Sequence, residues 1–218
     1  MCGRFTQRKD PAKLAEYYGV EDPYFVGSPR YNIAPQQMIQ AITSDRQIVG
    51  LKWGLIPSWA KDPKIANNLI NARAETLQEK PSFRTALAKR RCLIPADGWY
   101  EWKKEGDGKQ PYFFHQRDDG LFSFAGLWES WKSPEGETIQ TCTIITTEPN
   151  ELTANYHHRM PVILKRSDES HWLDTLARVS DLVQLLAPCP ADELEVYPVS
   201  RAVNSPGRDD ASLIDEAT

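Results

Sequence analysis

Cys2, in the opening "MCGRFT", is the first residue whose type and position could support unusual chemistry. Cysteine is small enough for methionine aminopeptidase to remove Met1, which would leave a free α-amine beside the thiol. The amine has a reference pKa of about 8 and the thiol one of about 8.5. Such a pair condenses with an aldehyde to an imine, and the thiolate then closes on the same carbon to form a thiazolidine. On residue type alone, an incidental N-terminal cysteine is the alternative.

Two further motifs supply polar side chains that could act beside Cys2. "NARAE" (71–75) places Asn71 and Arg73 in an irregular stretch, where an amide and a guanidinium group could face a ligand. For an isolated loop asparagine, turn formation is the competing role. "NYHHRMP" (155–161) contains adjacent histidines, and histidine transfers protons near neutral pH. His157 and His158 should point to different sides, so we expect one of them to face a site.

Glu101 stands between two aromatic residues in "DGWYEW" (97–102), on a predicted strand. Side chains alternate between the two faces of a strand, so we expect Trp99 and Glu101 on one face and Tyr100 and Trp102 on the other. A carboxylate pressed against aromatic surface has a raised pKa, which suits a general acid or base. Each stretch alone is also compatible with a structural role.

The remaining pattern predicts the elements that hold these residues. Asp10, Pro11 and Gly19 have the types of an N-cap, a first helical residue and a C-terminal stop, which predicts a helix between them. Short helices with serine caps, Ser82 among them, are predicted over 82–91, 167–176 and 180–188. Residues 28–35 and 57–75 are predicted as irregular loops. Runs rich in aromatic and β-branched residues predict strands over 37–43, 48–56, 97–104, 110–116, 121–131, 138–146, 160–164 and 194–200.

These elements predict a single mixed α+β domain around a curved, barrel-like antiparallel β-sheet with short flanking helices. The domain is expected to span residues 1–204, followed by a polar, flexible tail over 205–218. The chain has 218 residues, 40% hydrophobic and 26% charged, which is typical of a globular domain.

Composition excludes several classes of site. No apolar run reaches the length of about 18 residues that a membrane span needs, and no secretory signal is visible, so we expect a cytoplasmic protein. Four widely spaced cysteines form no CxxC or Cys/His cluster, so neither a metal nor another cofactor is expected. The net charge is −4, with the acidic residues concentrated after residue 150, which leaves room for a local basic groove elsewhere.

Seven motifs together give a sharper indication: "MCGRF", "YNIAP", "WGLIPSW", "INARAE", "CLIPADGWYEW", "HHRMPVIL" and "PVSRAV". In this order they resemble the SRAP (SOS response-associated peptidase) family, from Cys2 to about Asn204. The resemblance implies a mixed α/β domain around a β-barrel-like core. It also implies a protein that loses Met1 and traps abasic sites in single-stranded DNA as a thiazolidine crosslink. The resemblance further implies that this crosslink shields the lesion, places the protein at the nucleoid and can be reversed, while the family name records a proposed peptidase activity.

The resemblance also implies roles for individual residues. Cys2 would supply both amine and thiol, Asn71 would orient the cysteine or the sugar, and Glu101 would shuttle protons. His157 matches the histidine that acts on the sugar ring oxygen, and His158 is the alternative. Arginine and amide groups hold phosphates and aromatic rings stack on bases. The expected DNA contacts are Arg4, Asn32, Trp59, Arg73, Trp102, Thr146 and Arg159. We expect a monomer with no metal and no membrane partner.

Two other function classes fit part of the sequence. N-terminal-nucleophile amidohydrolases, including glutamine amidotransferases, also begin with Met-Cys-Gly and use the cysteine with its own amine as base. They usually continue with isoleucine where this chain has Arg4, and no glutamine-pocket motif is present. A non-catalytic module for single-stranded DNA would use the aromatic and arginine side chains and leave Cys2 incidental.

Overall fold

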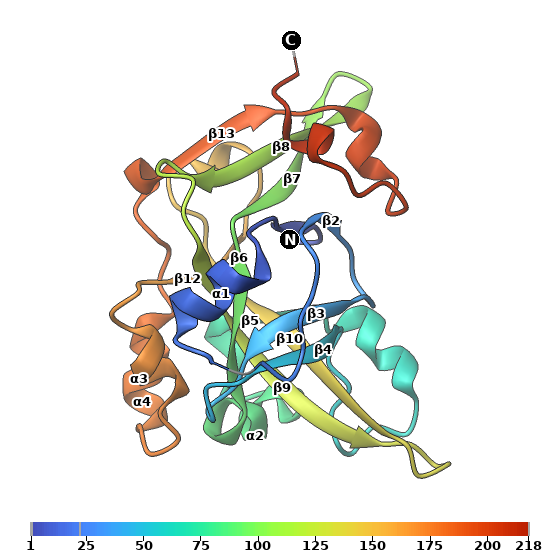
Figure 1. The fold of residues 1–218 in the computed structure, drawn as a ribbon, viewed down its shortest axis with the longest axis vertical. Helices are drawn as coiled ribbons and strands as arrows, with labels where there is room; N and C mark the ends of the chain where they lie inside the picture. Colours follow the sequence, from blue (N-terminus) through green and yellow to red (C-terminus); the bar gives the residue numbers. More distant parts are fainter. Residues whose placement is uncertain (1, 22, 218) are drawn as a thin grey trace.

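The computed structural model describes residues 2–21 and 23–217 of the chain. Its strands form two sheets, and the start of the chain runs between them (Figure 1). The larger sheet lies below the N-terminus in that view and the smaller one above it. Cys2, which the sequence predicts as the reactive residue, is buried in one cluster with barrel residues and with Trp99, and so lies at the junction of the two sheets.

The larger sheet closes into a five-stranded barrel, because its strand β10 pairs both with β4 and with β9. In order around the barrel the strands are β4 (Ile48–Trp53), β3 (Met38–Ile42), β6 (Arg91–Ala96), β9 (Phe122–Lys132) and β10 (Thr138–Thr147). Neighbours are antiparallel except β4 and β10, which run parallel. The predicted mixed fold around a barrel-like sheet is confirmed, and its parallel closure was not predicted.

Three short strands extend the barrel. They are β5 (Asn71–Arg73), parallel to β10; β11 (Met160–Pro161), antiparallel to β10; and β12 (Ile163–Leu164), antiparallel to β9. Strands β5 and β11 carry part of "NARAE" and of "HRMP", so both motifs lie against the same strand, β10.

The smaller sheet has the strand order β13 (Leu194–Pro198), β8 (Gly108–Gln116), β7 (Gly98–Glu105), β1 (Phe5–Gln7) and β2 (Arg30–Ile33). One of its faces packs on the barrel through Trp99 and Phe114, which belong to the same buried cluster as barrel residues. Its other face carries Tyr100 and Phe113 and is covered by the C-terminal segment. The predicted alternation along "DGWYEW" is therefore confirmed.

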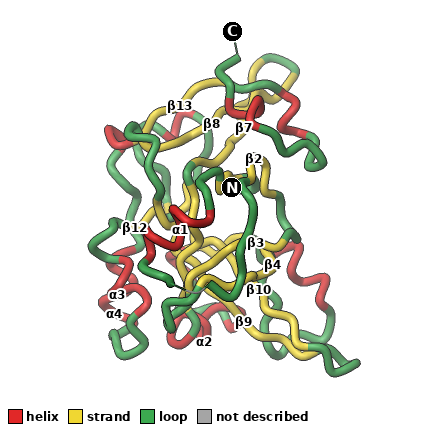
Figure 2. Tube along the Cα trace, in the orientation of Figure 1, coloured by secondary structure: helices red, strands yellow, loops and turns green. Residues whose placement is uncertain are grey.

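Helices cover the outside of the barrel, where Figure 2 shows them as short red segments around the yellow strands. The α-helices are α1 (Pro11–Tyr18), α2 (Pro81–Lys89), α3 (Glu169–Leu173) and α4 (Val179–Leu182). The 3₁₀ turns are η1 (Pro63–Asn68), η2 (Ala74–Thr76), η3 (Thr153–Asn155), η4 (Val183–Leu185), η5 (Ala191–Glu193), η6 (Arg201–Asn204) and η7 (Ala211–Ile214). None of the helices in the described ranges is long and apolar enough to cross a membrane.

The caps of α1 match the prediction and those of the other helices do not. The Asp10 side chain accepts a hydrogen bond from the Ala12 N–H at 2.8 Å, and Gly19 ends the helix with φ 67°. Helix α2 begins at Pro81, one residue before the predicted cap Ser82, because the fixed φ of proline suits the first helical position. The predicted serine caps of the two later helices are also wrong: α3 and α4 are preceded by Asp168 and Arg178.

The strands β1, β2 and β6 were not predicted from the sequence. All residues of β1 and β6 are buried, so their side chains do not alternate between apolar and polar types. Strand β2 lies inside 28–35, which was predicted as an irregular loop. Residues 57–75, predicted as a loop or a string of turns, contain η1, β5 and η2.

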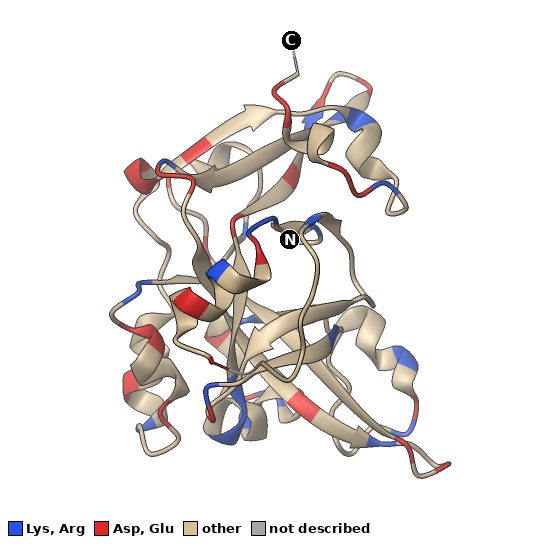
Figure 3. Ribbon diagram, viewed as in Figure 1, with Lys and Arg blue, Asp and Glu red and all other residues tan. Residues whose placement is uncertain are grey.

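Residues 205–217, expected as part of a flexible tail, are placed against the smaller sheet. Asp209 accepts hydrogen bonds from the backbone N–H groups of Tyr31 at 2.5 Å and Asn32 at 2.9 Å. Leu213 is buried beside Tyr100 and Phe113. The acidic surplus after residue 150 is visible in Figure 3 as red segments on β13 and the C-terminal stretch.

Candidate active site

Strand β1 brings Cys2 beside β7. Phe5 pairs with Trp99, and the Tyr100 N–H donates to the Arg4 carbonyl oxygen at 3.0 Å, so the strand pairing continues toward Cys2. The Cys2 side chain is fully buried, and its thiol lies 4.0 Å from the Arg4 carbonyl oxygen. Met1, whose removal the sequence predicts, lies outside the described residues.

Glu101 shares this buried region with Cys2. Its side chain is 3% exposed on the face of β7 that packs on the barrel, and burial raises its pKa to about 7. Burial, and then the negative charge of Glu101, raise the pKa of the Cys2 thiol well above its usual range. A carboxyl group with a pKa near 7 is present in both its acid and its base form at neutral pH, which suits proton transfer.

Asn71 holds the backbone of Cys2. Its Nδ2 group donates a hydrogen bond to the Cys2 carbonyl oxygen at 2.9 Å. The asparagine is fixed by β5, where it pairs with Ile144 of β10. Its Oδ1 atom is buried and accepts no hydrogen bond from any residue that the structure describes. The site therefore keeps one buried acceptor beside the cysteine.

His157 is neutral at pH 7, because burial lowers its pKa to about 4. The backbone N–H of Arg159 donates to its Nδ1 atom at 3.0 Å. The carbonyl oxygen of Arg159 also lies 3.1 Å from Nδ1, so whether Nδ1 accepts from the N–H or donates to the carbonyl depends on the ring tautomer. His158 stacks on His157 with 4.3 Å between ring centres, but it is exposed.

The segment that carries His157 lies over the face of the smaller sheet that carries Glu101. The ring of Tyr156 packs against Tyr112 with 4.7 Å between ring centres. Tyr112 is the pairing partner of Glu101 across β7 and β8. Side chains opposite each other in a sheet share a face. Asn71, Glu101 and the histidine segment thus reach the region of Cys2 from three different strands or turns.

The predicted DNA-contact residues differ in exposure: some are exposed to solvent, and others are buried or hydrogen-bonded within the protein. Arg73 is exposed on β5, and Trp59 is 56% exposed beside a hollow of about 340 Å³ that is also lined by Lys61, Lys64 and Asn68. Thr146 is buried in β10. These placements leave their roles toward DNA as predictions.

Three other predicted contacts hold the C-terminal segment. Arg4 donates to the Asn32 Oδ1 atom at 2.7 Å and to the Val203 carbonyl oxygen at 2.8 Å. Asn32 is fully buried and donates to the carbonyl oxygens of residues 203, 205 and 208. The Trp102 Nε1–H donates to the Asn204 Oδ1 atom at 2.7 Å.

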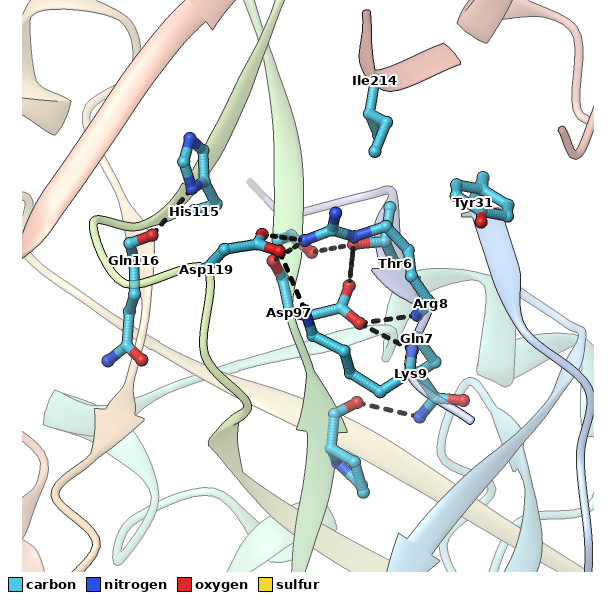
Figure 4. A network of polar contacts seen from close by, with 12 residues as sticks. Thr6, Gln7, Arg8, Lys9, Tyr31, Asp97, His115, Gln116, Asp119 and Ile214 are labelled. Atoms are coloured by element: carbon cyan, nitrogen blue, oxygen red, sulfur yellow. Dashed lines mark hydrogen bonds and ion pairs between the residues drawn. The ribbon is translucent and has the colours of Figure 1, made fainter. Parts of the chain in front are cut away.

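Asp97, a fully buried carboxylate next to β7, was not predicted from the sequence as a functional residue. It accepts hydrogen bonds from the Thr6 hydroxyl at 2.5 Å, the Arg8 N–H at 2.6 Å and the Lys9 N–H at 3.1 Å (Figure 4). The Arg8 Nε–H also donates to it at 2.9 Å. Asp97 thus fastens β1 and the two residues that follow it to the strand that carries Glu101. The sequence feature that could have identified Asp97 is its position directly before "GWYEW".

Comparisons with known proteins come from sequence and from structure. The family model described as "SOS response associated peptidase (SRAP)" matches residues 1–206. The abasic site processing protein YoqW of Bacillus subtilis is 47% identical, with 99% of both chains covered. The abasic site processing protein HMCES of Gallus gallus is 36% identical, covering 81% of this chain and 63% of that protein. A crystal structure of a protein from Bacteroides thetaiotaomicron has a TM-score of 0.93 at 31% identity, with both chains fully covered.

Proposed function

The chain belongs to the SOS response associated peptidase (SRAP) family, and from this premise we propose that it processes abasic sites in single-stranded DNA through a covalent bond from Cys2. The names of its relatives support the lesion as the substrate. The observation that carries the chemistry is the burial of Cys2 with Glu101 while Asn71 holds its backbone. The reagent is the amine and thiol that Cys2 presents once Met1 is removed.

The first step is the opening of the abasic sugar. The closed ring is a hemiacetal, and opening it moves the proton of the C1′ hydroxyl to the ring oxygen and yields an aldehyde. His157 is neutral, and in its Nε2–H tautomer, which the contact from the Arg159 N–H permits, it donates a hydrogen bond to the ring oxygen as the C–O bond breaks. This stabilises the negative charge that develops there. The step is an isomerisation with no net gain or loss of protons.

The second step joins the aldehyde to Cys2. The neutral amine attacks the aldehyde carbon to form a carbinolamine, and the protonated form of Glu101 gives its proton to the leaving hydroxyl, which departs as water. The resulting carboxylate then takes the proton of the Cys2 thiol, and the sulfur attacks the iminium carbon to close the thiazolidine. One water is released overall, and Glu101 returns to its acid form. Each step is reversible, so the same groups also support release of the DNA.

The raised pKa of the Cys2 thiol favours this order of events. A thiol that stays protonated until the iminium forms leaves the first attack to the amine. An N-terminal-nucleophile amidohydrolase would instead need a thiolate before its substrate is attacked. The buried thiol therefore supports aldehyde capture over amide hydrolysis.

Noncovalent binding positions the lesion. We assign a phosphate contact to Arg73 and base stacking to Trp59, with Arg4, Asn32, Trp102, Thr146 and Arg159 shaping the same groove. Because the net charge is −4, selectivity comes from the aldehyde more than from general attraction to DNA. The protein acts as a monomer on single-stranded DNA in the cytoplasm, at the nucleoid when bound.

The test is incubation of the purified protein with single-stranded DNA that carries one abasic site, followed by a denaturing gel. Mass spectrometry of the N-terminus first establishes that Met1 has been removed. We expect an adduct with the lesion, none with undamaged DNA and none with Cys2→Ala. An adduct of equal yield in Cys2→Ala would exclude the thiazolidine. Reversible binding alone would favour a non-catalytic module, and glutamine hydrolysis would favour the amidohydrolase.

A further inference from the structure

Glu75, the last residue of "NARAE", forms a two-point ion pair with Arg159 of "HRMP". The Arg159 Nη1 group donates to Oε1 at 2.8 Å and the Nη2 group to Oε2 at 2.9 Å. The Nη2 group also donates to the Thr146 carbonyl oxygen at 2.6 Å. Pairing at two points fixes the orientation of a guanidinium group as well as its distance. The Arg159 side chain is accordingly only 12% exposed.

This ion pair joins two short strands on opposite sides of β10. Thr146 of β10 pairs with Arg73 of β5 on one side and with Pro161 of β11 on the other. Glu75 follows β5, and Arg159 precedes β11. The strand that holds Asn71 against Cys2 is therefore tied to the segment that holds His157.

Arg159 connects Glu75 to the histidine ring. Its side chain is held by Glu75, while its backbone N–H donates to the Nδ1 atom of His157 at 3.0 Å. Any shift of Arg159 moves both backbone groups that face Nδ1, its N–H and its carbonyl oxygen. The place of the His157 ring and the balance of its two tautomers thus depend on a contact that starts at Glu75.

We propose that Glu75 is a positioning residue: by holding Arg159 it sets the place and the tautomer of His157 relative to Cys2. This inference rests on the proposed function, because it gives Glu75 a part at the same site. The competing interpretation is that Glu75 occupies Arg159 in place of a DNA phosphate and weakens binding. The Arg159 guanidinium group donates to three acceptor atoms and has low exposure. Turning it toward DNA would break these hydrogen bonds, which favours the positioning role.

Glu75→Gln tests the proposal, with Glu79→Gln as the matched control. Both variants remove one negative charge from the same segment, and Glu79 is exposed and forms no hydrogen bond or ion pair with any described residue. The rate of adduct formation is measured at saturating abasic DNA, and DNA affinity is measured with undamaged single strands. Nitrogen-15 NMR of labelled histidines, assigned through His157→Gln, reports the ring tautomer in the free protein.

We expect Glu75→Gln to slow adduct formation about tenfold, as small displacements of reacting groups do, with Glu79→Gln within about twofold of the unmodified chain. The His157 signals should change only in Glu75→Gln, toward a different balance of the two ring tautomers. Equal rates and equal spectra in the two variants would overturn the proposal. Tighter DNA binding by Glu75→Gln at an unchanged rate would overturn it in favour of competition with phosphate.

Failure of the proposed function has a different signature. It would appear as no Cys2-dependent adduct in the unmodified chain. The NMR comparison of the two variants would still report whether Glu75 governs His157.

Discussion

Burial raises the pKa of Glu101, and this confines its expected contribution to adduct formation to a definite pH range. Its pKa of about 7 in the folded chain compares with about 4.3 for an exposed glutamate. The acid form, which is proposed to expel water, is therefore lost as the pH rises through 7. We expect the rate of adduct formation to fall above that pH in the unmodified chain.

Glu101→Gln should remove this pH dependence and slow the reaction by about 100-fold or more, the usual contribution of a general acid–base group. Adduct formation is followed from pH 5 to 9 for both chains. A Gln variant with the same fall above pH 7 would assign that limb to a group other than Glu101.

The raised pKa of Glu101 also makes the stability of the folded chain depend on pH. The dependence has the opposite sign from that of a carboxylate whose pKa is lowered on folding. Between about pH 4.3 and 7 the folded chain keeps the Glu101 proton and the unfolded chain does not, so stability falls as the pH rises through this window. Glu101→Gln should therefore gain stability relative to the unmodified chain between pH 5 and pH 8. Denaturant midpoints at the two pH values measure this, and a constant difference would contradict it.

Asn71 offers a graded test of backbone positioning. Asn71→Ala removes the donor to the Cys2 carbonyl oxygen, and we expect adduct formation to slow about tenfold. Asn71→Asp should be slower still, because it places a carboxylate against that carbonyl oxygen and adds negative charge near Glu101. Rates at saturating DNA decide the order, and an Asp variant faster than the Ala variant would exclude a donor role.

At the scale of elements, the attachment of β1 depends on Asp97. Asp97→Asn keeps the shape but leaves an amide N–H group facing N–H donors, and it removes a buried charge partner of Arg8. We expect a loss of about 3–5 kcal/mol in the free energy of unfolding. Asp119→Asn, which breaks only the half-exposed pairs with Arg8 and Lys9, should cost less than about 1 kcal/mol. Denaturant unfolding measures both, and equal losses would contradict the central place of Asp97.

Sequence patterns predicted those helices and strands whose secondary structure is determined by their own residues. Helix α1 has its cap and its stop, and β7 has the alternation that separates Glu101 from Trp102. Strands β1 and β6 have neither signal, because they are buried on both faces and stabilised only by their neighbours. Contacts such as Glu75 with Arg159 join residues 84 positions apart and depend on β5 and β11 meeting β10. No local pattern contains that information.

At the scale of the whole molecule, an acidic chain is proposed to bind a polyanion. Its net charge is −4, with much of the acidic surplus on β13 and the C-terminal stretch (Figure 3). Few DNA phosphates can then be neutralised by Lys and Arg side chains. The noncovalent affinity for undamaged single strands should therefore depend only weakly on salt concentration. Each phosphate contact contributes a slope of about −0.7 in a plot of log affinity against log salt concentration.

Arg73→Ala should reduce this slope by roughly one contact's share, because Arg73 is the exposed arginine of "NARAE". The final yield of the adduct on abasic DNA should remain unchanged, because a covalent product accumulates even when its precursor is weakly bound. Affinity and yield are measured on the same strands over a range of salt concentrations. If Arg73→Ala leaves the slope unchanged, the phosphate contact belongs to another residue. If the yield falls with salt as steeply as the affinity, capture depends on general attraction and not on the aldehyde.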